Sequence, residues 1–380
     1  MKINFNKPYI SGKELFYISK AVIDGYSAGD GPFGKGCERN LNKILKTDDN
    51  ILLTTSCTSA LEIAALELDF NNEDEFILPS YTFVSTANAF CLRGAKPIFA
   101  DIDEDTLNID LKHAESLISR KTKSVIPVHY AGISCDMDEL MRIAEVNQLS
   151  VIEDAAQALT STYKGKNLGT FGDYSTFSFH ETKNVICGEG GALYTQNPTR
   201  KENAEMIREK GTDRAKFFRG QTDKYTWRTI GSSYVLSDLS AAFLSAQLEN
   251  IDDIQQRRFI VYNQYKSRLS ILAKKGLARI PHIPDYNSHN AHIFYLIVES
   301  KSTRSKLISF LKERDIMAVF HYVPLHTSPV GEKYGYKQGM LPVTEYISER
   351  LVRLPLCSSY DKDIADRVSD AVLEFFGVID

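Results

Sequence analysis

The chain of 380 residues lacks an excess of charge of either sign. It carries 45 Lys and Arg residues against 49 Asp and Glu residues, so its formal net charge is −4. A chain without an overall positive field has no general attraction for nucleic acid or for anionic membrane surfaces. Any anionic ligand must therefore be held by local groups, and we expect neither nucleic acid nor membrane among the partners.

Secretion signals, membrane spans and cysteine frameworks are also missing. Residues 1–6 lack the apolar core of a signal peptide, and no apolar run is long enough to cross a bilayer. The six cysteines are scattered, without the paired spacing of a zinc site or the density of a disulfide scaffold. We therefore expect a cytoplasmic protein with reduced thiols and no bound metal.

The chain does contain enough apolar material for a large core. With 43% hydrophobic residues, it is predicted to form a large α/β domain at residues 1–250 and a smaller C-terminal α+β domain at residues 251–380. No G-x-G-x-x-G follows the first predicted strand and no Walker lysine pattern occurs, so dinucleotide and P-loop interpretations lose support.

From about residue 50, short apolar strands alternate with amphipathic helices. The strands are predicted at 51–54, 76–78, 97–100, 124–128 and 150–152, and the helices between them at 56–68, 82–91, 111–118 and 137–146. This alternation predicts a three-layer domain with a mostly parallel sheet. Elsewhere we expect a helix at 13–23, a glycine-rich loop at 25–36, a long helical segment at 237–272, a strand at 292–298, and helices at 303–314 and 364–376.

Polar residues follow several of these strands, at the edge where ligands of parallel sheets gather. The first strand is followed by Ser56-Cys57-Thr58-Ser59 at the start of a helix, whose free amide groups and hydroxyls suit a phosphate. The alternative is simple N-capping by Ser56. The second strand is followed by Pro79-Ser80-Tyr81-Thr82-Phe83, which offers an aromatic ring that either stacks on a flat cofactor or belongs to the core.

The strand at 150–152 is followed by Glu153-Asp154-Ala155-Ala156-Gln157. A carboxylate at a buried strand end is costly unless it has a cationic partner. A protonated pyridine nitrogen would satisfy Asp154, and Gln157 could reach a ring hydroxyl. A helix cap or a metal ligand is the alternative, although no histidine lies close in sequence to complete a metal set.

One lysine, Lys183, follows an aromatic run and precedes a cluster of glycines in the stretch 177–191. An amine at such a place can anchor a carbonyl cofactor as a Schiff base, whereas a lysine taken alone is more often a surface residue. Ser178 supplies a second hydroxyl for phosphate. In this order, the residues are the parts needed to hold pyridoxal 5′-phosphate (PLP).

These motifs resemble those of the DegT/StrS-type sugar-nucleotide aminotransferases, which have the aspartate aminotransferase fold (PLP fold type I). The resemblance covers nearly the whole chain, and it also includes Asn6-Lys7-Pro8-Tyr9-Ile10, Val128-His129-Tyr130-Ala131-Gly132 and His321-Tyr322-Val323-Pro324-Leu325-His326. It implies that Lys183 is the Schiff-base lysine, Asp154 the partner of the pyridine nitrogen and Gln157 the contact to the ring oxygen. Phe83 becomes the stacking ring, and Thr58, Ser59 and Ser178 become phosphate contacts.

One motif departs from this family. Many members carry Asn-Tyr-Arg, with an asparagine that reaches the phosphate of the neighbouring subunit, where this chain has Ser233-Tyr234-Val235. The resemblance implies a homodimer with active sites at the interface. Ser233 can still donate one hydrogen bond to the cofactor there, but its side chain is shorter.

The stretches 178–184, 225–228 and 231–234 are similar to those of dTDP-4-amino-4,6-dideoxygalactose transaminases, which serve surface polysaccharides such as lipopolysaccharide and enterobacterial common antigen. This implies that L-glutamate, leaving as 2-oxoglutarate, aminates the 4-keto carbon of dTDP-4-keto-6-deoxy-D-glucose to give dTDP-4-amino-4,6-dideoxy-D-galactose. His180 and His326 are candidate sugar contacts, with structural histidines as the alternative. Arg219 and Arg228 are candidate nucleotide contacts, with a solvated loop as the alternative.

Other chemistries stay open at this point. A C3 aminotransferase acting on a dTDP-3-keto-6-deoxyhexose would use similar cofactor contacts. A sugar dehydratase would too, although dehydratases that resemble this family carry histidine at the position of Lys183. The non-enzyme alternative is a PLP-binding regulatory protein, which the complete set of Lys183, Asp154 and Gln157 disfavours.

Overall fold

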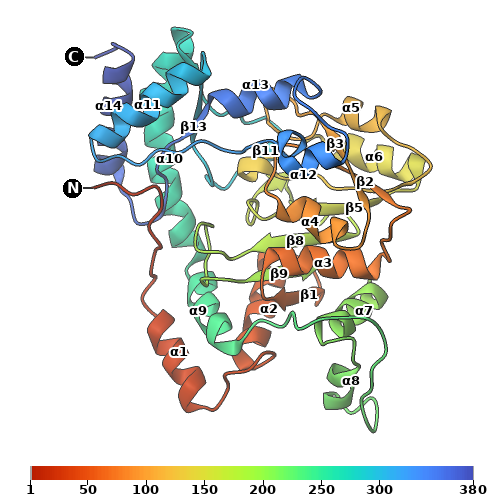
Figure 1. Ribbon diagram of the computed structural model, residues 1–380. Helices are drawn as coiled ribbons and strands as arrows, with labels where there is room; N and C mark the ends of the chain where they lie inside the picture. Colours follow the sequence, from red (N-terminus) through yellow and green to blue (C-terminus); the bar gives the residue numbers. More distant parts are fainter. Residues whose placement is uncertain (1, 380) are drawn as a thin grey trace.

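The computed structural model describes residues 2–379, and its centre is a seven-stranded sheet (Figure 1). Neighbouring strands are parallel except β9, which runs antiparallel to both β1 and β8. The sequence prediction of a mostly parallel sheet is therefore confirmed. In spatial order the strands are β1 (Ile51–Thr54), β9 (Gly191–Tyr194), β8 (Tyr174–Ser178), β5 (Ser150–Asp154), β4 (Thr122–Val125), β2 (Glu75–Pro79) and β3 (Lys96–Ala100).

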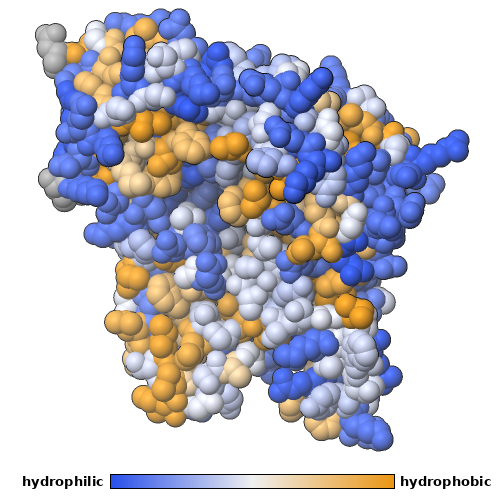
Figure 2. Space-filling view, viewed as in Figure 1, coloured by the Kyte–Doolittle hydropathy of each residue, from blue (hydrophilic) through white to orange (hydrophobic). Residues whose placement is uncertain are grey.

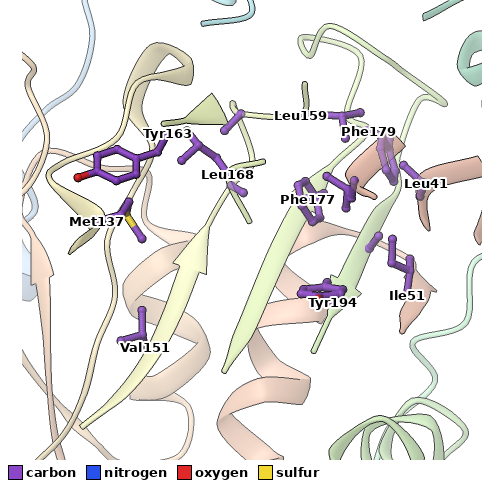
Figure 3. Close-up of a cluster of buried hydrophobic side chains, with 14 of the residues drawn as sticks. Leu41, Ile51, Met137, Val151, Leu159, Tyr163, Leu168, Phe177, Phe179 and Tyr194 are labelled. Atoms are coloured by element: carbon purple, nitrogen blue, oxygen red, sulfur yellow. The ribbon is translucent and has the colours of Figure 1, made fainter. Parts of the chain in front are cut away.

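Alternate side chains of these strands enter two different cores, because successive residues of a strand point to opposite faces. Ile51 and Leu53 belong to one buried cluster and Leu52 to the other. Figure 3 shows Val151 and Phe177 of the first cluster on neighbouring strands. The first cluster is covered by α2 (Pro32–Leu45), α5 (Leu111–Ser116), α6 (Met137–Asn147) and α9 (Asp238–Glu249), and the second by α3 (Cys57–Glu67), α4 (Ser85–Cys91) and α7 (Pro198–Arg208).

The C-terminal part has its own core. Its sheet has the order β10 (Ala278–Arg279), β12 (Tyr295–Val298), β13 (Leu351–Arg353), and its helices are α10 (Ile251–Lys274), α11 (Lys301–Glu313) and α14 (Lys362–Phe375). Ile3 is buried in the same core and bridges to Ile316, so the N-terminal arm packs against the C-terminal unit. The domain boundary at residue 250 stays a prediction.

A separate cluster of aromatic and aliphatic side chains joins the two units. Tyr81 and Tyr130 come from the ends of the large sheet, whereas Tyr295 and Leu351 come from the small one, beside α13 (Pro342–Arg350). All four side chains are fully buried. The cluster fixes the C-terminal unit next to the carboxyl ends of the parallel strands.

Two sequence expectations need correction. The segment 237–272 is not one helix, because α9 ends at Glu249 and α10 begins at Ile251. The glycine-rich loop is shorter than 25–36, since α2 begins at Pro32, a residue suited to the first turn of a helix. Gly34 lies inside α2, where its amide donates to Asp238 Oδ1 at 2.7 Å.

The remaining elements lie around this frame. They are α1 (Glu14–Ile23), β6 (Thr162–Tyr163), β7 (Lys166–Asn167), β11 (Asn287–Ser288), α8 (Arg214–Phe218), α12 (Pro329–Lys333) and the short 3₁₀ turns η1 (Tyr130–Gly132) and η2 (Leu325–Thr327). Within residues 2–379, no helix combines the length and apolar character needed to cross a membrane.

Candidate active site

A cavity of about 640 Å³ opens at the carboxyl ends of the parallel strands, next to the C-terminal unit. The large unit contributes most of its wall, and Tyr322 and Arg353 contribute from the C-terminal part. Seven of the residues predicted from sequence line this one cavity: Thr58, Phe83, Asp154, Gln157, Ser178, His180 and Lys183. The structure thus brings together side chains that are up to 125 positions apart, from Thr58 to Lys183.

Lys183 lies in the connection between β8 and β9, which continues the antiparallel pairing beyond the two strands. The amide of Phe179 donates to the carbonyl of Gly190 at 2.9 Å, and the amide of Glu181 donates to Gly188 at 3.0 Å. Asn184 attaches the far side of this loop, because its Nδ2 donates to the carbonyl of Asn290 at 2.8 Å. The reversed strand β9 therefore holds the lysine loop over the sheet end.

The Lys183 side chain is half-buried, and within residues 2–379 its Nζ has no hydrogen-bond partner. Burial lowers the pKa of this amine, and the positive charge of Arg353 lowers it further, while Asp154 opposes the shift. A lowered pKa increases the fraction of neutral amine, which is the nucleophilic form.

The start of α3 forms a donor-rich corner of the cavity. Ser56 is the N-cap, and its Oγ accepts from the amide of Ser59 at 3.0 Å, so the capping alternative is correct for Ser56 itself. Thr58 lines the cavity, whereas the Ser59 hydroxyl contacts Thr55 and Ser56 instead. A Cβ on Gly191 would lie only 2.3 Å from the Ser56 carbonyl carbon, so only glycine lets β9 approach this corner so closely.

Glu153 and Asp154 are adjacent in sequence, but their side chains lie in different surroundings. The Asp154 carboxylate lines the cavity, where Oδ2 accepts from Thr86 Oγ1 at 2.7 Å and Oδ1 from the Ala156 amide at 3.2 Å. Among residues 2–379 it has no ion-pair partner closer than 4.0 Å. Its remaining lone pairs are free for a cationic ligand.

Glu153 points away from the cavity and is fully buried. It accepts from His129 Nε2 at 2.8 Å and from the amides of Gly169 and Gly172, each at 2.8 Å. Burial alone raises the pKa of Glu153, but these donors outweigh burial, so the pKa lies below its usual value. The partners are a histidine and backbone amides, which replaces the metal-ligand alternative for Glu153 with a structural role.

Gln157 and Phe83 both lie beside Tyr322. The Gln157 Nε2 donates to the Tyr322 hydroxyl at 3.1 Å, while its Oε1 accepts from the Ala131 amide at 2.8 Å. The Phe83 ring lies 6.4 Å from the Tyr322 ring between centroids and is 58% exposed. An exposed aromatic face at a cavity rim is available for a planar ligand, so the core alternative for Phe83 does not hold.

Besides Ser59, four predicted residues lie outside the cavity. His326 is fully buried and bonds Ser80 Oγ at 2.7 Å and Glu345 Oε1 at 3.0 Å, which favours its structural alternative. Arg219 pairs with Glu205 and Arg228 with Asp213, at 2.8 and 2.7 Å. Ser233 is exposed at the surface.

The sequence interpretation assigned no role to several cavity residues, among them Thr86, His292, Tyr322 and Arg353. Thr86 had a usable signal, because it follows Thr82 by one helical turn and the two hydroxyls meet at 2.8 Å. His292 is held through Nδ1 by Asn184 Oδ1 at 2.7 Å, a contact across 108 positions. Nothing local in the sequence marks Arg353.

The donor set fits PLP. An amine without a partner lies in the same cavity as a carboxylate that lacks a cation, and both share it with hydroxyls and backbone amides at the start of a helix. The amine can bind the aldehyde of PLP, the carboxylate can bind its pyridinium nitrogen, and the hydroxyls and amides can bind its phosphate. Within residues 2–379, no group of three or more His, Cys, Asp or Glu side chains is placed to hold a metal ion.

Comparison with known proteins points the same way. The pattern of the DegT/DnrJ/EryC1/StrS aminotransferase family matches residues 10–373. The spore coat polysaccharide biosynthesis protein SpsC of Bacillus subtilis is 34% identical over 97% of this chain and 95% of its own length.

Two solved structures are similar over nearly their full lengths. Spr1654 from Streptococcus pneumoniae, a candidate sugar aminotransferase solved in a PLP form, is 26% identical with a TM-score of 0.91, over 99% of this chain and 98% of its own. DesV from S. venezuelae is 30% identical with a TM-score of 0.87, over 97% and 95%. Spr1654 has also been solved in a PMP form.

Proposed function

Because the chain belongs to the DegT/DnrJ/EryC1/StrS aminotransferase family, whose members use PLP, we propose that it transfers an amino group from L-glutamate to a nucleotide-linked keto sugar. The observation that carries this proposal is the unpaired amine of Lys183 in one cavity with the unpaired carboxylate of Asp154. A regulatory PLP-binding protein would not need a free amine with a lowered pKa.

Different residues of the cavity would bind different parts of the cofactor. Lys183 would hold the aldehyde carbon, Asp154 the ring nitrogen, and Thr58, Ser178 and the first amides of α3 the phosphate. Phe83 would stack on the ring, and Gln157 would contact its oxygen. When bound, PLP supplies a ring that withdraws electrons from the carbon bearing the amino group.

Lys183 then does the proton chemistry. With PLP and the amino donor bound, the amine of Lys183 would be positioned to take a proton from the donor's α carbon. In the second half of the reaction it returns a proton to the sugar carbon that receives nitrogen. Asp154 would face the pyridine nitrogen, and Thr86 Oγ1 and the Ala156 amide hold its carboxylate in place by hydrogen bonds of 2.7 and 3.2 Å.

We place the sugar acceptor among the dTDP-linked 6-deoxyhexoses. The supporting observations are the subgroup motifs at 178–184 and 225–228 and the similarity to SpsC, whose name assigns it to polysaccharide biosynthesis. The preferred reaction aminates the 4-keto carbon of dTDP-4-keto-6-deoxy-D-glucose to give dTDP-4-amino-4,6-dideoxy-D-galactose for a surface polysaccharide. NMR of the product formed with L-glutamate tests this, since amination at C3 of a 3-keto isomer, or the opposite configuration at C4, would overturn it.

We further propose a homodimer with the active sites at its interface. Apolar side chains gather over α1, where Leu15, Phe16 and Ile23 are 76%, 65% and 82% exposed (Figure 2). Trp227 is 71% exposed on the segment that leads to Ser233. Such surfaces favour contact with a second copy, which could bring Ser233 to the partner's cofactor phosphate. Light scattering of the purified protein measures the oligomeric state, and a monomer at micromolar concentration would refute the dimer.

The visible spectrum tests the whole proposal. Purified protein loaded with PLP should absorb in the visible range, and L-glutamate should bleach that band while 2-oxoglutarate appears. Addition of the keto sugar should restore the band. A protein that binds no PLP, or whose PLP band ignores glutamate, would contradict the proposed function.

A further inference from the structure

The N-terminal arm, residues 2–11, runs without helical structure from the C-terminal unit to the large unit (Figure 1). At its start, the amide of Ile3 donates to the carbonyl of Asp315, beyond the end of α11, at 2.8 Å. At its other end, the carbonyl of Tyr9 accepts from Nε2 of Gln247, on α9, at 2.9 Å. The arm is therefore fixed at both ends, to different units of the protein.

Between these ends, the arm packs against the back of the loop that carries Lys183. Asn6 Nδ2 donates to the carbonyl of Glu181, two residues before the lysine, at 2.9 Å. The space that remains beside residues 6–9 and Lys183 is a cavity of only about 10 Å³, with room for one water molecule at most. Lys183 lines this small cavity and also the large one. The loop is therefore a wall with the active site on one side and the arm on the other.

Two asparagine amides attach this loop to other parts of the chain, on either side of Lys183. Asn6 binds the carbonyl before the lysine, and Asn184, directly after it, donates to the carbonyl of Asn290 at 2.8 Å. The amide of Glu181 is bound within the loop, whereas among the described residues only Asn6 donates to its carbonyl. Loss of the Asn6 amide therefore frees the loop on one of its two sides.

The arm in turn is held by the C-terminal unit along its length. The Tyr360 hydroxyl donates to the carbonyl of Asn4 at 2.7 Å, and Ser359 Oγ donates to the carbonyl of Pro8 at 3.2 Å. Both contacts use backbone oxygens of the arm, so the path of the arm does not depend on these side chains. Asn6 differs, because it is the Asn6 side chain that contacts the lysine loop.

We propose that the arm is a strap that sets the position of the Lys183 amine, with Asn6 as the positioning residue. This inference rests on the proposed function, because the amine must reach both the cofactor aldehyde and the α carbon of the donor. A displacement of about 1 Å is enough to slow such a reaction about 100-fold. Asn6 does not line the active-site cavity, so it acts through the loop and not on a ligand.

Hydrogen exchange of the apoprotein tests this attachment without any turnover. Asn6→Ala removes the donor, and mass spectrometry should show about 2- to 10-fold faster exchange of the amides at 179–190, since one net hydrogen bond is lost. The matched control is Asn4→Ala, because the Asn4 side chain is exposed and makes no hydrogen bond within residues 2–379. Unchanged exchange in Asn6→Ala, or equal acceleration in both variants, would overturn the proposal.

A third variant, Tyr360→Phe, loosens the arm at a point away from the loop. It removes the hydroxyl that binds the carbonyl of Asn4 and keeps the ring, so exchange at 179–190 should also become faster, by less than about threefold. If Asn6→Ala accelerates the exchange and Tyr360→Phe does not, the contact at Glu181 is local, the arm does not act as a strap, and the proposal fails.

Single-turnover kinetics separate positioning from binding. L-Glutamate should bleach the visible band of PLP-loaded Asn6→Ala about 3- to 10-fold more slowly at saturation, because the amine is displaced. The glutamate concentration at half-maximal rate should change less than about twofold, since the surfaces that bind the donor stay in place. Asn4→Ala should keep the wild-type rate. A higher half-saturating concentration with an unchanged rate at saturation would make Asn6 a binding residue and contradict its positioning role.

Failure of this inference is distinguishable from failure of the proposed function. If wild-type PLP-loaded protein does not respond to L-glutamate, the proposed function fails whatever the exchange data show. If wild-type protein transfers the amino group but Asn6→Ala keeps the wild-type exchange and single-turnover rate, only the role of the arm fails.

Discussion

The cavity and the segment 214–234 both concentrate polar and aromatic residues, yet their charged groups are in opposite situations. In the cavity, Lys183 and Arg353 have no acidic partner. In the segment, Lys216 and Arg219 pair with Glu202 and Glu205 of α7, each at 2.8 Å. A dense run of basic residues is therefore a poorer sign of a binding site than a single cation that its own fold leaves unpaired.

The two regions are also held in place by different kinds of contact. The cavity wall is stabilised by buried contacts such as the one between Glu153 and His129, whose side chains are both fully buried. The segment is attached through surface pairs such as Arg228 with Asp213, in which the arginine is 54% exposed. Surface pairs are screened by solvent and salt, whereas buried pairs are screened much less. Substitutions in the two regions should differ accordingly, and the predictions below begin with the largest expected difference.

Lys183→Ala should have the largest effect. Loss of the amine removes both the attachment of PLP and the proton transfer, which alone is worth about 10²- to 10⁴-fold in rate. The matched variant is Lys224→Ala, which removes an exposed lysine of the segment. Chromatographic assay of aminated sugar should show no product for Lys183→Ala and a rate near wild type for Lys224→Ala. An equal loss of rate in both variants would contradict the conclusion that the cavity, and not the segment, carries the catalytic lysine.

Glu153→Gln should destabilise the fold beneath the cavity by about 2–3 kcal/mol, since charge-assisted hydrogen bonds to a buried carboxylate are lost. The pKa of Glu153 is lowered in the folded protein, so its contribution is fully present above the unfolded pKa of about 4.3 and disappears as the pH falls through the lower folded value. Denaturant titrations should therefore show a constant difference from wild type above about pH 5 that shrinks in acid. A difference that grows in acid would reverse the assigned sign.

Gly191→Ala should loosen the phosphate corner of the cavity. Its Cβ would collide with the Ser56 backbone, and overpacking of this size costs about 1–3 kcal/mol, or about 5- to 150-fold in PLP affinity if the start of α3 moves. In the control Gly36→Ala, the nearest atom is an Arg39 side-chain nitrogen at 3.9 Å, so α2 accepts the methyl. Titration of the apoprotein with PLP, followed by fluorescence, measures both. Unchanged affinity for Gly191→Ala would show that the corner does not bind phosphate.

The sequence predicted the cavity residues that end a strand or begin the next helix. Asp154 and Thr58 follow apolar strands directly, so the rule that ligands gather at the carboxyl ends of parallel strands was enough to group them. It could not predict Arg353, because β13 has only three residues and the face of its last residue depends on pairing with β12. It also could not tell that Arg219 would be neutralised, since Glu205 precedes it by 14 positions on another helix.

Arg219→Gln and Arg228→Gln should have the smallest effects, and they decide whether the segment belongs to the site at all. Both side chains are more than 40% exposed and already paired, so any nucleotide contact must compete with Glu205 or Asp213. If the segment reaches the sugar nucleotide across the dimer, steady-state kinetics should show roughly a two- to fivefold higher KM for the sugar nucleotide and an unchanged KM for glutamate. The increase should fade at high salt, because exposed charges are screened there. Unchanged kinetics for both variants would show that these arginines only form surface ion pairs with Glu205 and Asp213 and do not contact the sugar nucleotide.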